Sequence, residues 1–309
     1  MIGKLSNSAS ENRKAGVCMH KNVSRNMIER FHYDEDELYL LVDEAYSDVA
    51  QNICELHRHT NVRAFASFDA EHIQDIFDLP QNAAVLLLAE PESYVKCKLY
   101  QYLDFNDGEP RIPGTNSRVL IFPAEALCSM LSVPVETDFD ARDALLGALK
   151  SNTRYRIITD AGTDITFESR HWIPLDFEVC TAPAEGSING QIVADGALFF
   201  KKIDEPLIFT IENGKLTNIQ AVSVAGESLV EEYRQMTVRD MVDPVNTQLA
   251  EIGIGFCHGA EISDCFMEAE TVINTCHFCF GNNVCYGGKN SSEFHGASVL
   301  IKNPKFEIM

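Results

Sequence analysis

The sequence predicts an α/β domain with a parallel, Rossmann-like sheet, followed by a mostly β domain. Between about Asp34 and Thr159, continuous apolar runs alternate with segments of helical periodicity, the pattern of a parallel sheet covered on both faces. Beyond about Asp160 the pattern changes to alternating apolar and polar residues broken by turns. With 309 residues, 45% of them hydrophobic, the chain can bury two ordinary cores. We expect a flexible arm, an α/β domain and a β-rich domain over residues 1–30, 31–159 and 160–309.

The N-terminal 30 residues are polar, rich in Asn and Ser, and show little apolar periodicity, which is typical of a flexible arm. After Asp34 the apolar residues recur at helical spacing and predict an amphipathic helix through Leu38, Leu41, Val42, Ala45, Val49 and Ile53. His57 and His59 follow this helix. Cations at a helix C-terminus are ordinary, so we assign them no metal.

The remaining elements of the α/β domain alternate between strand and helix. Apolar runs predict strands at Val62–Ser67, Ala83–Ala89, Arg118–Pro123 and Tyr155–Thr159. Helical patterns predict helices at Glu71–Phe77, Ala124–Leu131 and Ala141–Lys150. The segment Asp104–Asn116 is rich in Gly, Pro, Asn and Asp and predicts a loop. No GxGxxG or GxxxxGK[ST] motif occurs, so nucleotide binding is not supported.

A hairpin is predicted in the β-rich domain, where Asn213-Gly214 separates the apolar runs Leu207–Ile211 and Leu216–Val222. Asn-Gly adopts the turn whose twist matches that of the flanking strands.

The formal net charge of -21 disfavours nucleic acids and anionic membrane surfaces as partners and favours a ligand such as the free amine of a peptide. No apolar run approaches the roughly 20 residues of a membrane span, and the N-terminal segment lacks the apolar centre of a signal peptide. We therefore expect a cytoplasmic protein. The ten cysteines are scattered through a large chain, so most should be reduced thiols.

Possible metal ligands concentrate between Leu249 and Pro304. This stretch holds Glu251, Glu268, Glu270, His277 and His295, with Cys257, Cys265, Cys276, Cys279 and Cys285. Carboxylate and imidazole together suit a divalent metal such as zinc, manganese or iron. Upstream, Glu178 lies in an apolar run, so its side chain faces either solvent at an edge or a buried site where a cation or proton compensates its charge. Periodicity alone leaves both possibilities open.

The cysteines offer an alternative, a thiolate-rich zinc site built from Cys276, Cys279, Cys285 and His295. Structural zinc sites commonly pair two C-x₂-C units, and the sequence has no second unit at a suitable distance. Cys276 and Cys279 would also project to opposite faces of a strand. We therefore do not favour a structural zinc.

Several motifs, in their order along the chain, resemble the aminopeptidase T family of metallopeptidases. They are EVCTAPAEGSINGQIVADGAL, PLIFTIENGKL, LAEIGIG, the glutamate of EAETVINTCHFCFGNN, and YGGKNSSEFHG. The motifs span roughly Glu178–Pro304, and residues 34–159 agree in architecture only. The resemblance implies an N-terminal α/β domain and a C-terminal domain whose two-metal site removes N-terminal residues from peptides. It also implies a homodimer.

Carried over by residue, the resemblance makes Glu178, Glu251, His277 and His295 ligands of one or two ions of zinc, manganese, cobalt or iron. It places Glu270 close to the metals as a carboxylate that accepts a proton. One departure is plain: where the family reads His-x-Asp, with Asp as a further ligand, this chain reads His295-Gly296-Ala297. In an extended segment Glu293 shares the face of Ala297 and is the one candidate substitute.

Three functions follow from this reading. The first is a metal-dependent aminopeptidase-like hydrolase of peptides or small amides, in which Glu251 or Glu270 handles the proton. The second is a catalytically degenerate peptide-binding protein, for example in peptide natural-product biosynthesis. The third is a mononuclear-iron ring-cleaving dioxygenase, which would draw its carboxylate from Glu178 or Glu251. We place the hydrolase first and the dioxygenase last.

Overall fold

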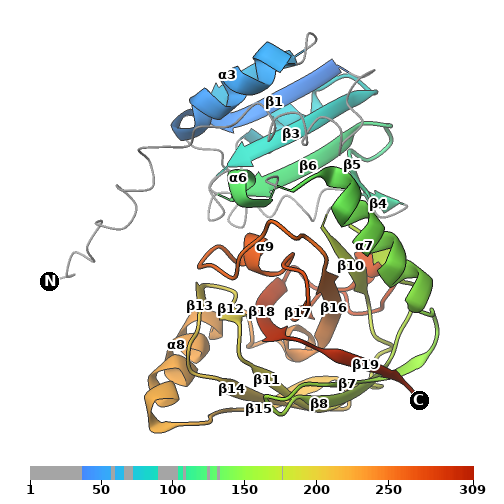
Figure 1. The fold of residues 1–309 in the computed structure, drawn as a ribbon, viewed down its shortest axis with the longest axis vertical. Coiled ribbons are helices and arrows are strands. Elements are labelled where there is room, and N and C mark those ends of the chain that lie inside the picture. The colour runs from blue at the N-terminus through green and yellow to red at the C-terminus, as the bar shows by residue number, and fades with distance from the viewer. Residues whose placement is uncertain are drawn as a thin grey trace, which may run out of the picture.

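The computed structural model describes residues 37–56, 60–65, 72–89, 104–106, 109–123, 126–130, 133–175 and 177–309 (Figure 1). The predicted arm and the pair His57 and His59 lie outside these residues. The described chain forms one mixed sheet, in which β2, β1, β3 and β6 run parallel, and two antiparallel sheets that pack as a sandwich. None of the helices within these ranges has the length and apolar character to cross a membrane.

The mixed sheet has the strand order β2-β1-β3-β6-β5-β4. Its parallel strands are β1 Glu37–Asp43, β2 Thr60–Phe65, β3 Ala83–Ala89 and β6 Arg118–Pro123, and the short antiparallel strands β4 Asp104–Asn106 and β5 Glu109–Arg111 extend one edge. The helical segments η1 Glu44–Tyr46, α3 Ser47–Leu56 and α4 Ile73–Phe77 connect strands of this sheet, and α6 Leu127–Met130 follows β6.

Both faces of the neighbouring strands β1 and β3 are buried. Leu40 and Leu86 pack with Ile53 of α3 on one face, whereas on the other face Leu41 packs with Ile76 of α4. Burial on both faces explains why these strands read as continuous apolar runs instead of alternating ones.

The helix predicted from Asp34 onward is wrong over its first half. Glu37–Asp43 forms strand β1, and helix begins only at Ser47. The run LYLLV is apolar at consecutive positions, which suits a buried strand as well as a helix, and periodicity alone cannot separate the two. The loop predicted at Asp104–Asn116 contains β4 and β5 and is therefore partly wrong as well.

The β-rich part contains two antiparallel sheets. The seven-stranded sheet has the order β13-β12-β18-β17-β16-β10-β9, and the six-stranded sheet has the order β15-β14-β11-β8-β7-β19. Their strands are β7 Arg154–Ile158, β8 Asp164–Glu168, β9 Ile173–Pro174, β10 Glu178–Thr181, β11 Asn189–Ala194, β12 Ala197–Leu198, β13 Lys201–Lys202, β14 Leu207–Glu212, β15 Lys215–Ala221, β16 Leu249–Gly255, β17 Thr275–Gly281, β18 His295–Lys302 and β19 Lys305–Ile308. Between them lie η4 Val224–Gly226, α8 Glu227–Thr237, η5 Pro244–Thr247, α9 Phe266–Ala269 and η6 Val284–Tyr286.

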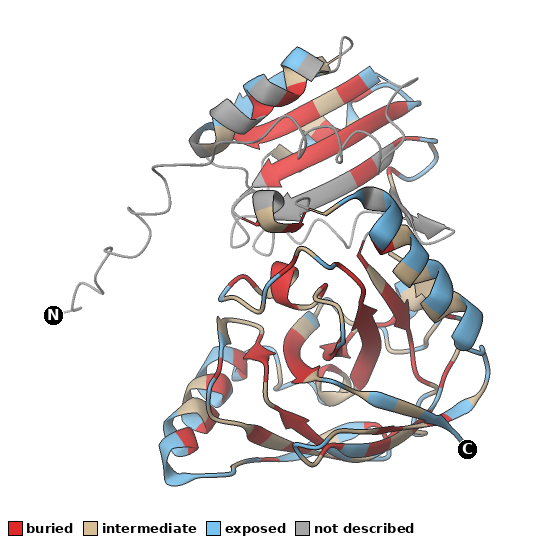
Figure 2. Cartoon of the chain, viewed as in Figure 1, coloured by how far each residue is buried: buried red, intermediate tan, exposed pale blue. Residues whose placement is uncertain are grey.

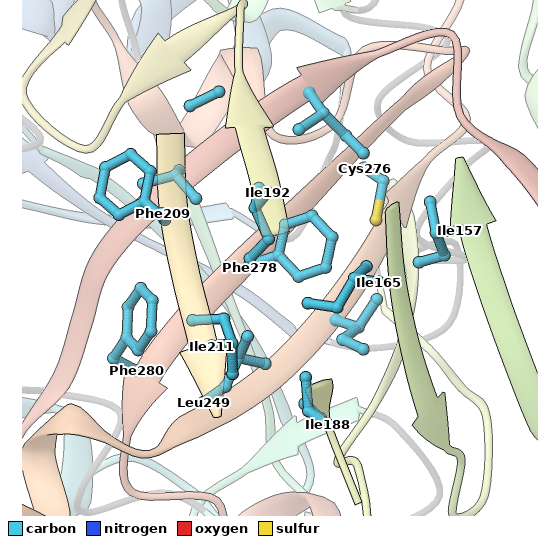
Figure 3. Packing of buried hydrophobic residues seen from close by; sticks show 14 of the residues in the cluster. Ile157, Ile165, Ile188, Ile192, Phe209, Ile211, Leu249, Cys276, Phe278 and Phe280 are labelled. Carbon is cyan, nitrogen blue, oxygen red and sulfur yellow. The ribbon is translucent and has the colours of Figure 1, made fainter. Parts of the chain in front are cut away.

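The two antiparallel sheets bury one apolar core between them. Figure 3 shows Phe278 and Phe280 of β17 among Ile165, Ile192 and Phe209 of the opposite sheet. Strands β16 and β17 of the seven-stranded sheet are buried along their whole length (Figure 2), so their second face is covered too. That second face carries the polar residues discussed below.

The predicted hairpin is confirmed as β14 and β15. Asn213 and Gly214 have φ values of 51° and 84°, the positive values that a type I′ turn requires. The strand predicted at Tyr155–Thr159 forms as β7, but it pairs with β8 and β19 and not with the parallel sheet.

Helix α7 Val135–Ala148 links the two parts and begins before the helix predicted at Ala141–Lys150. Asp138 on this helix accepts hydrogen bonds at 3.0 Å from the backbone and ring nitrogens of His258. Ser129 donates to the buried carboxylate of Glu268 at 2.6 Å. These contacts attach His258 to α7 and α9 to the segment of α6.

Candidate metal centre

The candidate site lies on the face of the seven-stranded sheet that points away from the sandwich core. Side chains alternate along a strand, so on β10 Val179 enters the core while Glu178 and Cys180 face the other way. On β17, Cys276, Phe278 and Phe280 belong to the core, and His277 and Cys279 lie on the opposite face. Adjacent strands thereby align their polar side chains over one patch of sheet.

A β-bulge brings Glu251 to this patch. Leu249 belongs to the sandwich core, and the register of β16 against β17 shifts between Leu249 and Glu251. The extra residue reverses the alternation, so Ile252 and Ile254 stay in the core and Glu251 faces the site. Glu251 is 2% exposed.

The first ligand group consists of Glu178, Cys180, Glu251 and His277, each of which offers one donor atom within 4.8 Å of the others. Nδ1 of His277 lies 3.5 Å from Oε2 of Glu178, and its Nε2 lies 3.7 Å from Oε1 of Glu251. The imidazole thus stands between two carboxylates. Both separations exceed ordinary hydrogen-bond length.

The second ligand group consists of Glu251, Cys279 and His295, again with donor atoms within 4.8 Å of one another. Nε2 of His295 lies 2.8 Å from Oε2 of Glu251, and Nδ1 lies 2.7 Å from the carbonyl oxygen of Asn282. A carbonyl on one ring nitrogen fixes the tautomer that leaves the other nitrogen free to act as a ligand. Glu251 belongs to both groups.

Three buried polar atoms in this patch have no hydrogen-bond partner: Oε2 of Glu178, Oε1 of Glu251 and Nδ1 of His277. Such atoms are costly to bury and call for a compensating ligand. Two carboxylate oxygens and an imidazole nitrogen are donors that a divalent cation satisfies. The residues present therefore fit a metal ion.

The charges of the metal-free site are strongly perturbed. Burial raises the pKa of Glu178 and of the Cys180 thiol well above their ordinary values. Burial also opposes ionisation of Glu251, but the nearby imidazole of His277 and the hydrogen bond from His295 hold its pKa well below the ordinary value. Burial alone would lower the pKa of His277, yet the negative charge of Glu178 raises it well above the usual range. The surroundings therefore shift the pKa values of the neighbouring carboxyl groups Glu178 and Glu251 in opposite directions.

Glu270 follows α9 at the edge of the patch. Burial raises its pKa to about 7, with His277 opposing and Glu251 adding to the shift. It belongs to neither ligand group. A carboxylate whose pKa lies near neutrality is suited to accept and release a proton.

Ala297 does not face the site. Gly296 and Ala297 have φ values of 156° and 51°, and the register of β18 shifts beside them. Ala297 packs in the sandwich core, whereas Ser298 faces the site, with Oγ 2.7 Å from Sγ of Cys279. The prediction of an extended segment that puts Glu293 and Ala297 on one face is wrong, because this bulge interrupts the alternation of side chains. Glu293, the expected substitute, is exposed and belongs to neither ligand group.

The structure brings together the four residues that the resemblance implies as ligands: Glu178, Glu251, His277 and His295. Sequence reasoning missed Cys180, and it considered Cys279 only for the structural zinc site that it did not favour. Each lies two positions beyond a predicted ligand on the same strand, and strand alternation was the signal that could have found them. Cys276 and Cys279 do project to opposite faces, as expected.

No family model matches the chain, and no curated protein sequence matches it. Solved structures with a similar fold include the two that follow. A 2,5-dihydroxypyridine dioxygenase from Pseudomonas putida KT2440 aligns with a TM-score of 0.60 and 16% identity, over 93% of this chain and 93% of that chain. The aminopeptidase T AmpT from Thermus thermophilus aligns with a TM-score of 0.55 and 13% identity, over 97% of this chain and 96% of that chain. At such identities the likeness concerns the fold, and function has to be argued from the site.

Proposed function

We propose that this chain is a metal-dependent, aminopeptidase-like hydrolase that acts on peptides or small amides. The position of Glu251 between the two ligand groups carries the proposal. Its Oε1 faces His277 at 3.7 Å, and its Oε2 faces His295 at 2.8 Å. A carboxylate that offers one oxygen to each of two positions suits a two-metal hydrolytic site.

In this proposal Glu178, Cys180 and His277 hold one ion, His295 holds a second, and Glu251 is shared. A bound metal pair supplies Lewis-acid polarisation of the scissile carbonyl and lowers the pKa of the attacking water. The three unpartnered buried atoms of the first group support this assignment.

Glu270 takes the role of general base. Its pKa of about 7 in the metal-free protein and its charge coupling to Glu251, His277 and His295 support that role. It accepts the proton of the attacking water and returns it to the leaving amine. The net charge of -21 favours a substrate with a free amine.

A mononuclear-iron ring-cleaving dioxygenase is the second candidate. The TM-score of 0.60 to the dioxygenase supports it, and so does the availability of His277, His295 and Glu251 as two imidazoles and a carboxylate. The thiols of Cys180 and Cys279 argue against it, because thiols beside an oxygen-activating iron are liable to oxidation.

The test is release of amino acids from a mixed peptide pool by protein loaded separately with zinc, manganese, cobalt or ferrous iron. We expect cleavage by the wild type. Glu270→Gln should lower kcat by about 10²- to 10⁴-fold while metal content is kept. Glu268→Gln is the matched control, because Glu268 lies two positions away and bonds to Ser129 and Ser263 instead of the site.

Two outcomes contradict the proposal. Peptides that bind without cleavage, whatever metal is supplied, identify a binding protein. Oxygen uptake with ferrous iron and a dihydroxypyridine, without peptide cleavage, identifies a dioxygenase.

A further inference from the structure

The geometry points to Cys279 as a thiolate ligand of the second metal position, where it supplies a negative charge beside that of Glu251. It also follows that this position prefers zinc or cobalt to manganese. This inference rests on the proposed two-metal function and names one ligand that sequence reasoning did not assign.

Three adjacent strands converge on the second position. Glu251 comes from β16, Cys279 from β17 and His295 from β18, and their donor atoms lie within 4.8 Å of one another. Cys279 is paired with Glu251 in the register of β16 and β17. Its side chain is 4% exposed, so the sulfur faces the site and not solvent.

The bulge at Gly296 and Ala297 explains why the sulfur takes this place. It turns Ala297 into the sandwich core and turns Ser298 toward Cys279. An acidic side chain at position 297 would therefore enter apolar surroundings instead of the site. The hydroxyl of Ser298, 2.7 Å from the sulfur, can donate a hydrogen bond to a thiolate there.

Charge balance favours Cys279 as a metal-bound thiolate over Cys279 as an uncoordinated thiol. Without it, the second position has one shared carboxylate and one neutral imidazole to offset two positive charges. The unpartnered Oε1 of Glu251 faces His277 in the first position, so this carboxylate offers only Oε2 to the second position. A thiolate adds one negative charge and shifts the preference from manganese toward zinc and cobalt, because thiolates are soft ligands.

The test is a cobalt(II) titration of the metal-free protein, followed by the sulfur-to-cobalt charge-transfer absorption and by bound cobalt per chain. Three variants are compared with wild type: Cys279→Ala, Cys279→Asp and Cys180→Ser. Cys276→Ala is the matched control, because Cys276 lies on the same strand but points into the core.

We expect two cobalt ions per wild-type chain with sulfur absorption. Cys279→Ala should lower the affinity for the second cobalt ion by about tenfold or more and remove part of the sulfur-to-cobalt absorption. Cys279→Asp should still bind the second cobalt ion, but without the sulfur-to-cobalt absorption of that ion. It should also bind manganese more tightly than wild type does. Cys180→Ser should remove the absorption of the first ion alone, and Cys276→Ala should change neither property.

Cys279→Ala or Cys279→Asp with undiminished sulfur absorption overturns the inference, as does a wild type that binds no second ion. Failure of the proposed function has a different signature. If wild type binds two ions with a Cys279-dependent absorption yet cleaves no peptide, the ligand assignment stands and the hydrolase does not.

Discussion

The imidazole of His277 occupies the space that a side chain on Gly253 would fill. A Cβ built on Gly253 would lie 2.0 Å from Cε1 and 2.5 Å from Nε2 of His277. The two residues face each other across β16 and β17 in a paired register. The missing side chain therefore makes room for a metal ligand.

Gly253→Ala should displace His277 and empty the first metal position. A separation of 2.0 Å is far below van der Waals contact, and the ring is 1% exposed, so it cannot move without disturbing its neighbours. We expect at most one metal per chain by elemental analysis.

Gly147→Ala is the control for this variant. Gly147 lies on α7 with nothing within 4 Å of an added Cβ, so alanine should raise the free energy of unfolding by up to about 1 kcal/mol. Its metal content should equal that of wild type. A Gly253→Ala protein that keeps two metals would show that His277 is not a ligand.

Ala297→Asp should lower stability without adding metal. The substitution buries a carboxylate in the apolar core and should cost about 2 kcal/mol or more in unfolding free energy. Aspartate tolerates the positive φ of 51° better than alanine, but that gain is a few tenths of a kcal/mol. Denaturant melts and metal content measure the two effects.

Ala297→Gly separates the effect of backbone conformation at position 297 from the effect of an added carboxylate. Glycine at a positive φ relieves strain, so this variant should fold with wild-type metal content. An Ala297→Asp protein that binds more metal than wild type would show that position 297 faces the site.

Much of the α/β domain follows from its apolar runs, and Ala83–Ala89 and Arg118–Pro123 are strands with the predicted bounds. The strand Glu37–Asp43 was mistaken for helix because its second buried face depends on neighbours distant in sequence. The hairpin at Asn213 was predictable because its turn chemistry is local.

The site was less accessible to sequence reasoning. Motif resemblance named Glu178 and His277 but passed over Cys180, whose role depends on which strands are adjacent. The bulge at Ala297 could not be predicted, because alanine has no local preference for a positive φ. A contact with Tyr233, 64 residues away in sequence, holds that bulge.

Tyr233→Phe should destabilise the bulge at Gly296 and Ala297. Tyr233 is fully buried on α8 and donates a hydrogen bond to the carbonyl oxygen of Ala297 at 2.5 Å. Its loss leaves that oxygen unpaired and should cost about 1–3 kcal/mol in unfolding free energy. Because the same bulge orients His295 and Ser298, the second metal should bind more weakly. Thr237→Val, which removes a buried hydroxyl of the same helix, should lower stability without this effect on metal.

Metal binding should release protons and strengthen as pH rises. Burial raises the pKa of Glu178 and of Cys180 in the metal-free protein, so both groups bind their protons more tightly than exposed side chains do. A cation displaces these protons, and the displacement costs less at higher pH. Calorimetry in buffers of different ionisation enthalpy counts the protons released. No proton release at pH 6 would contradict the assigned ligands.

The central claim is that Glu251 is shared by two metal positions, and elemental analysis of wild type and Glu251→Gln after zinc saturation and desalting tests it most directly. We predict two zinc ions per wild-type chain and less than one in Glu251→Gln, because the substitution removes a charged ligand from both positions at once. A wild type that holds no zinc, or a Glu251→Gln protein that keeps both ions, would contradict the claim.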